Sequence, residues 1–412
     1  MSEFLVTNCR QIVTVSGPPG PRTGLAMREL SIVPNGAMLV RDGRLHAVGP
    51  REVVERKVTA ATAVVDAGGR IILPGFVDAH THAVFAGNRA NEFEQRIEGA
   101  TYNEIAAQGG GIRATVRRTR EAGEAEILDA GRRYREWFWR GGTTTIEAKS
   151  GYGLSLDAEL KMLRVIRQLG YVATFLGAHE VPDEYRGNRA GYVDLLIREM
   201  LPPARDLAGF CDVFCEPAVF PVEESRRILQ EAARLGFGLR VHADQFANDG
   251  GARLAAELGA VTADHLEYTD DEGLRALAGA GVQPVLLPGS VFSLGGSRYP
   301  AARRMIELGL ALVLATDFNP GSSPTASMPM ILSLACSQMR LTPAEAITAS
   351  TINAACSLRL GGEVGSLEAG KRADFVIQDC DDYRELPYFF GREPAHAVYI
   401  GGSCVYERRR DA

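Results

Sequence analysis

The 412-residue sequence predicts an α/β fold, a (β/α)8 TIM-type barrel accompanied by a small composite β-sandwich domain from both termini. Two observations predict this fold. Between residues 69 and 360, short apolar segments alternate with longer amphipathic segments, a pattern typical of parallel strands joined by crossover helices. Residues 1–68 and 361–412 contain short alternating segments separated by turns, so we expect these two ends to form one β domain beside the barrel.

Both ends of the chain are predicted to be rich in strands. The segment LSIVPNGAMLVRDGRLHAVG alternates apolar and polar positions around the turn signals PNG and DG. The apolar run IIL then stops at Pro74-Gly75, and a second run, FV, leads directly into polar residues. Residues 361–412 return to strands and turns in GEVGSLEAGKRADFVIQD and AVYIGGSCVYE.

The predicted barrel strands are apolar segments that each run into a polar end: GTTTIEAKSGYG, VATFLGAHE, FCDVFCEP, LRVHADQ, AVTADHLE, VQPVLLPG and LALVLATDFNP. Helical patterns such as LDAELKMLRVIRQLG and VEESRRILQEAARLG separate them and end in a glycine, which commonly follows the last turn of a helix. The length of this region and the number of its repeats favour a closed barrel. The periodicity alone leaves a doubly wound open sheet as the alternative.

The composition argues against several classes of protein. The formal net charge is -6, so the basic surplus of a nucleic-acid-binding protein is absent. The seven cysteines are scattered, and Cys211 and Cys215 have no second Cys or His pair to complete a metal site, so we interpret them as reduced thiols. With no signal-peptide pattern and no apolar run of about 20 residues, we expect a cytoplasmic protein without a membrane or nucleic-acid partner.

Five of the seven histidines lie where an apolar segment gives way to a polar one: His80, His82, His179, His242 and His265. In a barrel, these strand ends meet on the face where active sites are built. Residues two apart on a strand point to the same face, so the imidazoles at 80 and 82 can bind one ion. An isolated pair of this kind is more often solvated in a loop.

Asp78 and Asp317 add carboxylates to this pattern. Asp78 precedes the paired histidines by two residues and is expected on the same face. Asp317 ends the last apolar segment, and taken singly it is as readily a satisfied polar strand end as a ligand. Together with His242 and the histidine pair, it makes a mixed nitrogen and oxygen set that suits Zn2+ or Fe2+. Such an ion lowers the pKa of a water towards about 7, so the set predicts a metal-dependent hydrolase.

A second group of polar residues suits a substrate that carries a carboxylate. Arg89, Tyr102 and Tyr152 follow the predicted strand ends, and arginine binds carboxylates with two parallel hydrogen bonds. The alternative is that each is an ordinary surface residue. The segment DFNPGSSP can offer backbone N–H groups and a hydroxyl to a ligand, or can be a plain turn. The GGG run lacks the pattern of a phosphate-binding loop, and no GxSxG motif indicates a serine hydrolase.

The motif PGFVDAHTH, the strand-end His242 and His265, and ATD resemble the amidohydrolase superfamily of metallo-dependent hydrolases over nearly the full chain. More narrowly, HTHAVFAGNRANEFEQRIEGATYNEI, EAKSGYGL, GAHEVPDEYRGNR and ATDFNPGSSPT resemble the imidazolonepropionase family of histidine degradation. This resemblance implies hydrolysis of a C–N bond in the cyclic amide of 4-imidazolone-5-propanoate, which gives N-formimidoyl-L-glutamate. It also implies a barrel with a composite β domain, a homodimer, and one Zn2+ or Fe2+/Fe3+ ion per chain.

The resemblance carries specific roles onto matching residues. It implies four metal ligands, which are His80, His82, His242 and Asp317. It implies that the substrate contacts Arg89, Tyr152, His179, Gln245 and Ser322, and that the product contacts Asn319 and Gly321. The implied catalytic residues are His265 and Asp317.

Two departures from the family pattern bear on mechanism. Gln245 replaces a glutamate found in some members, and an amide cannot shuttle a proton, so proton transfer falls to Asp317 and His265. The lysine that bridges two metals from strand 4 in other members is missing, since we place FLGAHE there, which favours one metal. Two rival interpretations remain. A nucleobase aminohydrolase would use the same metal site but would have less use for Arg89 and Tyr152, and a catalytically inactive scaffold would lose metal ligands.

Overall fold

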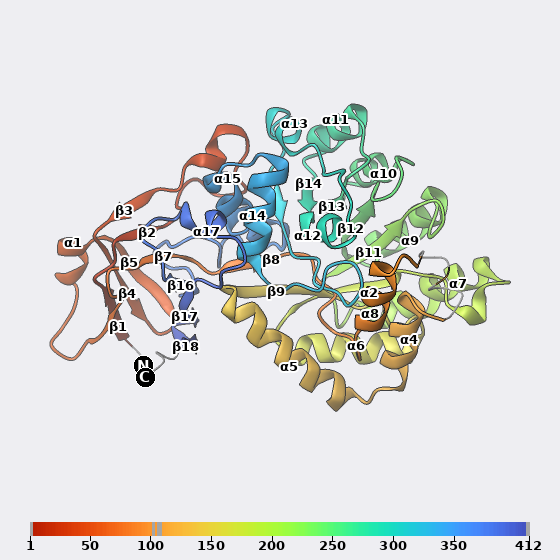
Figure 1. Cartoon of the computed structure of the whole chain (residues 1–412), viewed down its shortest axis with the longest axis horizontal. Coiled ribbons are helices and arrows are strands. Elements are labelled where there is room, and N and C mark those ends of the chain that lie inside the picture. Colours follow the sequence, from red (N-terminus) through yellow and green to blue (C-terminus); the bar gives the residue numbers. More distant parts are fainter. Residues whose placement is uncertain (1–2, 101–103, 105–108, 409–412) are drawn as a thin grey trace.

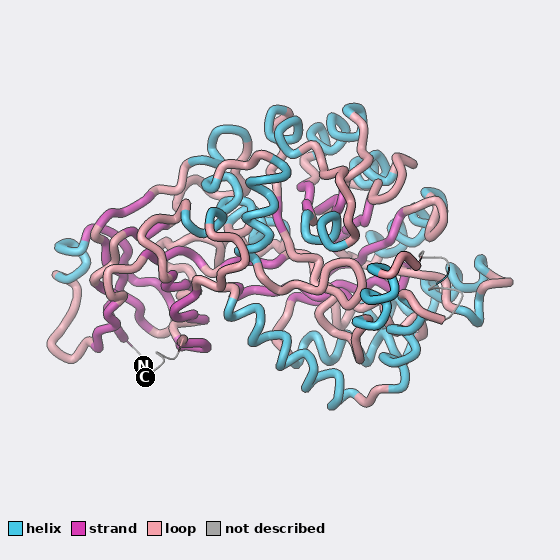
Figure 2. Tube along the Cα trace, viewed as in Figure 1, coloured by secondary structure: helices cyan, strands magenta, loops and turns pink. Residues whose placement is uncertain are grey.

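The computed structural model describes residues 3–100, 104 and 109–408. A β-sandwich lies at one end of the molecule and a larger barrel at the other, and strands from the N-terminal and C-terminal regions lie together in the sandwich (Figure 1). Helices surround the strands of the barrel, whereas the sandwich consists mainly of strands and loops (Figure 2). The predicted combination of a barrel and a composite sandwich is confirmed.

The barrel contains eight parallel strands that follow one another in chain order. They are β8 (Phe76–Asp78), β9 (Thr143–Lys149), β10 (Val172–Ala178), β11 (Phe210–Cys215), β12 (Gly238–Ala243), β13 (Thr262–His265), β14 (Gln283–Leu286) and β15 (Val313–Leu314). Sequential parallel pairing without a reversal in strand order excludes the doubly wound alternative.

Residues just after the first and last strands close the barrel. The N–H of Asp317 donates to the carbonyl of His80 at 3.0 Å, and the N–H of His82 donates to the carbonyl of Phe318 at 2.9 Å. Asp78 reinforces this seam, because its carboxylate accepts from the N–H of Thr316 at 3.0 Å and from its hydroxyl at 2.6 Å. Asp78, the last residue of β8, is thereby bonded to the segment that follows β15.

The remaining elements of the barrel region are helices, several of which begin or end at the expected capping residues. One example is α11, which begins after Asp270, whose side chain accepts from Gly273 N–H, and ends at Gly281 in the left-handed conformation. The helices are α2 (Ala90–Ile97), α4 (Ile112–Glu121), α5 (Glu124–Arg140), α6 (Leu156–Gln168), η2 (Asp183–Tyr185), α7 (Arg189–Leu195), the π-helical η3 (Leu196–Met200), α8 (Leu201–Ala204), α9 (Val222–Arg234), α10 (Gly251–Glu257), α11 (Asp271–Ala280), α12 (Pro288–Ser293), α13 (Ala302–Glu307), α14 (Met328–Met339), α15 (Pro343–Ala349) and α16 (Ile352–Ser357).

The sandwich consists of two sheets with an apolar interior between them. One sheet has the order β5 (Arg44–Pro50), β4 (Gly36–Arg41), β1 (Glu3–Thr7) and β6 (Ala63–Asp66). The other has the order β18 (Ser403–Glu407), β17 (Ala395–Ile400), β16 (Phe375–Gln378), β7 (Ile71–Pro74), β2 (Gln11–Val13) and β3 (Ile32–Pro34). Short helices η1 (Gly24–Arg28), α1 (Arg51–Glu55) and α17 (Glu385–Tyr388) lie in the same terminal segments.

One strand differs from the predicted division at residue 69. Strand β7 pairs with β16 and β2 in the sandwich, so this apolar run is not part of the barrel. The chain crosses to the barrel at Gly75, where a Cβ atom would lie only 2.1 Å from the Thr144 hydroxyl. We therefore propose that the barrel part begins at Phe76.

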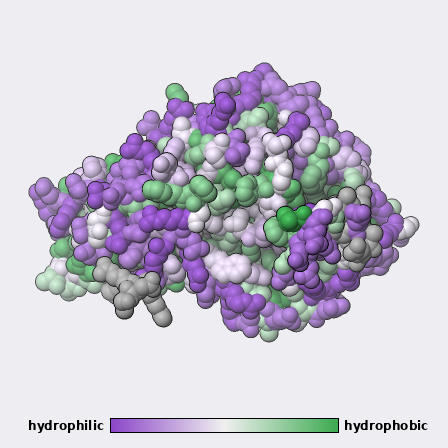
Figure 3. All heavy atoms as spheres, in the orientation of Figure 1, coloured by the Kyte–Doolittle hydropathy of each residue, from purple (hydrophilic) through white to green (hydrophobic). Residues whose placement is uncertain are grey.

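Several surface and compositional features complete the fold. All seven cysteines are free thiols, as predicted. Among the described residues, no helix is both long and apolar enough to span a bilayer. Apolar side chains gather across the middle of the face shown in Figure 3, over α14, and the exposed large residues of the chain include Phe292, Tyr388 and Phe390.

Candidate metal centre and substrate pocket

Three histidines from two barrel strands meet at the C-terminal end of the barrel. His80 and His82 follow β8, His242 lies in β12, and one nitrogen from each ring lies within 4.8 Å of the others. Asp317, after β15, places Oδ1 3.6 Å from Nε2 of both His80 and His82. Asp317 has a positive φ of 53°, and the seam hydrogen bond of its N–H to His80 holds it there. The seam therefore brings the carboxylate to the paired histidines.

The donor set fits a divalent cation. His80 Nε2 is buried and has no hydrogen-bond partner among the described residues, which is costly unless something else binds it. Burial lowers the pKa of His80 and of His82 well below the usual value, and the charge of Lys149 lowers that of His80 further. Neutral imidazoles with a free ring nitrogen are the form that binds metals.

Two carboxylates orient these imidazoles from behind. Asp264 Oδ2 lies 2.6 Å from His80 Nδ1, and Asp212 Oδ2 lies 3.1 Å from His242 Nδ1. The contact of His80 is a hydrogen bond, and an ionised carboxylate only accepts, so Nδ1 of His80 carries the proton and its Nε2 keeps a lone pair. The contact of His242 is an ion pair without hydrogen-bond geometry, which places the Asp212 carboxylate behind the ring. This is the usual arrangement behind a metal-binding histidine.

His265 and Asp317 are two titratable residues beside the cluster, and the His265 ring lies 5.3 Å from that of His242. Burial raises the pKa of Asp317 to about 6. Burial alone would lower the pKa of His265, but the Glu267 carboxylate, 3.4 Å from its Nδ1, outweighs burial and the net pKa is raised. A carboxylate and an imidazole whose pKa values are both raised suit the exchange of protons with a substrate.

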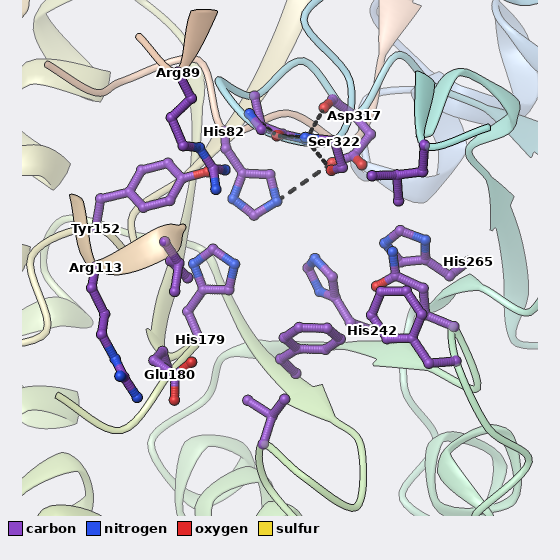
Figure 4. A pocket seen from close by; sticks show the side chains of 18 of the residues that line it. His82, Arg89, Arg113, Tyr152, His179, Glu180, His242, His265, Asp317 and Ser322 are labelled. Atoms are coloured by element: carbon purple, nitrogen blue, oxygen red, sulfur yellow. Dashed lines mark hydrogen bonds and ion pairs between the residues drawn. The ribbon is translucent and has the colours of Figure 1, made fainter. Parts of the chain in front are cut away.

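A cavity of about 690 Å³ opens in front of this cluster. Figure 4 shows His82, His179, His242, His265 and Asp317 around it, with Arg89 and Tyr152 on one side. These residues come from different strand ends and loops, which is how barrel active sites are assembled.

Arg89 presents a poorly satisfied guanidinium to the cavity. Its Nε is buried without a hydrogen-bond partner among the described residues, and its nearest carboxylate, on Glu92, is 3.9 Å away. The guanidinium lies against the backbone of Gly321, where a Cβ atom would approach Arg89 Nη2 to 1.7 Å. Gly321 therefore leaves the room that Arg89 occupies.

His179 is held in one tautomer. Its Nδ1 lies 2.9 Å from the carbonyl of Gly151, which can only accept, so Nδ1 carries the proton and Nε2 is a free acceptor. Burial lowers the pKa of His179 to about 3, so the ring is neutral at physiological pH. The neighbouring Tyr152 is also buried, and burial raises the pKa of its hydroxyl, which therefore keeps its proton.

The other predicted binding residues also line the cavity, with one outside the described part of the chain. Gln245 lines the cavity, and its N–H donates to Glu216 Oε1 at 2.6 Å. Asn319 lines it too, but its side chain already bonds the N–H groups of Gly321 and Ser322 and the Ser322 hydroxyl, so it shapes the loop. Tyr102 lies outside the described residues.

Sequence reasoning missed the charged residues behind the histidines: Glu147, Lys149, Asp212, Arg240 and Asp264. All are fully buried in barrel strands. The alternation in TIEAK, where 147 and 149 share a face, was the available signal. The segment FLGAHE is also corrected: it belongs to the third barrel strand, β10, while the fourth, β11, reads FCDVFC and contains no lysine.

Comparison with known proteins relates the whole chain to others. Residues 71–405 match the model of the Amidohydrolase family. The imidazolonepropionase of Solibacter usitatus is 67% identical over 99% of this chain and 100% of its own length, and that of Symbiobacterium thermophilum is 52% identical over 98% and 97%. Among solved structures, E. coli guanine deaminase has a TM-score of 0.73 at 16% identity, covering 99% of this chain and 100% of that chain. A triazine hydrolase variant has a TM-score of 0.74 at 18% identity, covering 99% and 95%. At these identities the solved structures share only the fold.

Proposed function

The chain belongs to the amidohydrolase family, and since its full-length curated relatives are imidazolonepropionases, we propose that this hydrolase opens the cyclic amide of 4-imidazolone-5-propanoate. The product would be N-formimidoyl-L-glutamate, an intermediate of histidine breakdown. The observation that carries this proposal is one cavity that combines the candidate metal-binding histidines with Arg89, whose Nε has no hydrogen-bond partner among the described residues. This combination matches a substrate that has a scissile amide at one end and a carboxylate at the other.

We propose that His80, His82, His242 and Asp317 hold one divalent ion, either Zn2+ or iron. The mixed nitrogen and oxygen set is typical of both metals. When bound, the ion supplies an activated water at neutral pH and polarises the amide carbonyl. His80 and His242 would offer Nε2 to the ion, because Asp264 and Asp212 lie against their Nδ1 atoms.

The proton transfers would fall to Asp317 and His265. Asp317 takes the proton from the attacking water, and the proton then passes to the ring nitrogen as the C–N bond breaks. His265 donates a hydrogen bond to the oxygen that gains negative charge on the carbonyl. Gln245 can orient the ring or a water, but its amide accepts and donates hydrogen bonds without transferring a proton.

Three other residues would bind the substrate. Arg89 pairs with the propanoate carboxylate, and the Tyr152 hydroxyl donates to the same group. His179 accepts a ring N–H at its free Nε2. These contacts would orient the ring with its amide towards Asp317 and the histidines.

The assembly would be a homodimer in the cytoplasm. Phe292, Tyr388 and Phe390 are 56%, 73% and 78% exposed and border an apolar groove beside α14, and large exposed apolar patches are characteristic of interfaces. A second copy covering this groove would remove them from water. Sedimentation of the wild type and of Phe390→Asp tests this, with a monomeric wild type as the contradicting result. The free thiols support a reducing compartment.

Steady-state hydrolysis of 4-imidazolone-5-propanoate by metal-assayed protein tests the proposal directly. Arg89→Ala should raise KM about ten- to hundredfold with little change in kcat, because a charge-assisted hydrogen bond is worth about 1.5–3 kcal/mol. An unchanged KM would exclude the role of Arg89. Ammonia release from guanine or cytosine, without hydrolysis of the imidazolone, would favour the aminohydrolase. Protein that retains no metal and shows neither activity would favour the inactive scaffold.

A further inference from the structure

A fully buried lysine lies behind the histidine cluster. Lys149 is the last residue of β9, and its Nζ lies 2.9 Å from Glu147 Oε1, 2.9 Å from Asp212 Oδ2 and 3.8 Å from Asp264 Oδ2. All four side chains are completely buried. Burying charged groups costs several kcal/mol each, so a cluster of this size needs an explanation.

The carboxylates that contact Lys149 are the same ones that orient the histidines. Asp212 Oδ2 contacts both Lys149 Nζ and His242 Nδ1. Asp264 Oδ2 contacts His80 Nδ1 and lies 3.8 Å from Lys149 Nζ. The Lys149 ammonium therefore faces the two carboxylate oxygens that lie against His242 and His80.

The third carboxylate extends this connection to the backbone between His80 and His82. Glu147 Oε2 accepts from the N–H of Thr81 at 3.1 Å, and the Thr81 hydroxyl donates to the Glu147 carbonyl at 2.6 Å. The N–H of Lys149 donates to the Thr81 carbonyl at 2.9 Å. Residues 147 and 149 therefore fix the peptide that carries both paired histidines.

The charges of the cluster are not balanced within it. Arg240 Nη2 lies 3.7 Å from Asp264 Oδ2, so two cations face three carboxylates and one formal negative charge remains. The excess lies behind the two imidazoles whose Nε2 atoms face the candidate metal site, where it favours a cation.

We propose that Lys149 is a positioning residue for the metal centre: its ammonium holds the Asp212 and Asp264 carboxylates in place behind the imidazoles and thereby fixes the orientation and the Nδ1–H tautomers of His242 and His80. The inference rests on the proposed metal site and adds a residue to it. Without the ammonium, two buried carboxylates would lose the cation that both of them face, and the repulsion between them would displace them from the imidazoles. The imidazoles would then lose their fixed orientation.

The decisive experiment measures zinc affinity by chelator competition for four proteins: wild type, Lys149→Met, Asp212→Asn and the double variant. Each single change should weaken zinc binding about ten- to hundredfold, the range known for groups that orient metal ligands. The double variant should bind zinc no more weakly than the single variant with the lower zinc affinity, because both changes break the same contact between Lys149 and Asp212. The double variant removes one positive and one negative charge, so it can still be measured if Lys149→Met alone does not fold.

A second readout distinguishes positioning from simple structural support. In the metal-free protein, 15N spectra should show the Nδ1–H tautomer for His80 and His242 in the wild type and a mixture in the variants that bind zinc weakly. Lys371→Met is the matched control, since this part-buried lysine donates hydrogen bonds to Gly361 and Ser366. The zinc affinity of this variant should equal that of the wild type.

The outcomes separate the two proposals. Two results would overturn the role of Lys149 but leave the metal site in place. One is wild-type zinc affinity with unchanged histidine tautomers in the variants, and the other is a loss of zinc affinity in the double variant that equals the sum of the losses in the two single variants. A wild type that binds no divalent metal would remove the proposed function itself.

Discussion

The interior of the sandwich and the C-terminal end of the barrel are both buried, but the first is filled with apolar side chains and the second with polar and charged ones. Between the sandwich sheets lie Phe4, Ile72 and Phe375, and the ring of Phe375 stacks on Tyr399 at 4.4 Å. The barrel end contains histidines, carboxylates, a lysine and an arginine. Burial of apolar surface stabilises by about 25 cal/mol per Å², whereas buried charges cost free energy unless they are paired. The difference indicates that the sandwich supplies stability and the barrel end supplies chemistry.

The strongest test of this division removes a ligand. His242→Ala should abolish metal retention and measurable turnover, because it takes away one of three imidazoles and removes the ring that lies 3.1 Å from the buried Asp212 carboxylate. Metal content per chain and kcat/KM measure the effect. A variant with full metal content and wild-type turnover would contradict the proposed ligand set.

The converse test removes a large ring from the sandwich. Phe375→Ala should lower the free energy of unfolding by about 3–5 kcal/mol, because it leaves a cavity between the two sheets. The metal content and kcat of the folded protein should stay unchanged. Denaturant unfolding and steady-state kinetics measure both, and a lower kcat in fully folded protein would break the proposed separation.

A smaller change tests the binding side of the cavity without removing a charged group. Gly321→Ala would place a Cβ atom on the Arg89 guanidinium and displace it. We expect KM to rise by about tenfold or less, since part of a charge-assisted hydrogen bond is lost, while kcat and metal content stay near wild type. Kinetics with the acid substrate check this, and an unaltered KM would mean that Arg89 does not need its present position.

The smallest effect concerns a buried carboxylate whose role is stability alone. Burial raises the pKa of Glu345, but hydrogen bonds from Arg303, the Thr342 N–H and Arg28 outweigh it and lower the net value below 4.5. Its ionised form therefore stabilises the fold above about pH 4.5, and this contribution is lost as the pH falls through the lower folded value. Glu345→Gln should lower stability by about 1 kcal/mol at pH 7, with turnover unchanged.

The measurement for Glu345→Gln is thermal unfolding from pH 7 to pH 3. The difference in Tm between wild type and variant should be largest at pH 7 and should become smaller in acid. A gap that widens in acid would reverse the sign of the assigned pKa shift.

Much of this arrangement could be predicted because strand ends are visible in a sequence. An apolar run that turns polar marks where a barrel strand stops, and this placed His80, His242, His265 and Asp317 on one rim. The fold class followed from the same alternation. The substrate roles depended on the resemblance to a family.

The rest depends on partners that sequence pattern does not reveal. The run at 71–73 looks like a barrel strand, but its pairing with β16 is decided some 300 residues later. Asp78 shares a strand with the histidines, yet its bonds to Thr316 are set by barrel closure. In the sequence, Lys149 and Asp212 are only charged residues within apolar strands, and their role depends on contacts between strands that the sequence does not show.

The composite sandwich also determines when the protein can finish folding. Ile72 pairs with Ile377, so the six-stranded sheet waits until almost the whole chain has been synthesised. At about 5–20 residues per second, the N-terminal strands spend roughly 15–60 seconds without these partners. During that interval their apolar faces are open to other nascent chains. A chain that terminates before Phe375 would contain the whole barrel sequence but would lack β16, and the unpaired edge of β7 would be prone to aggregation.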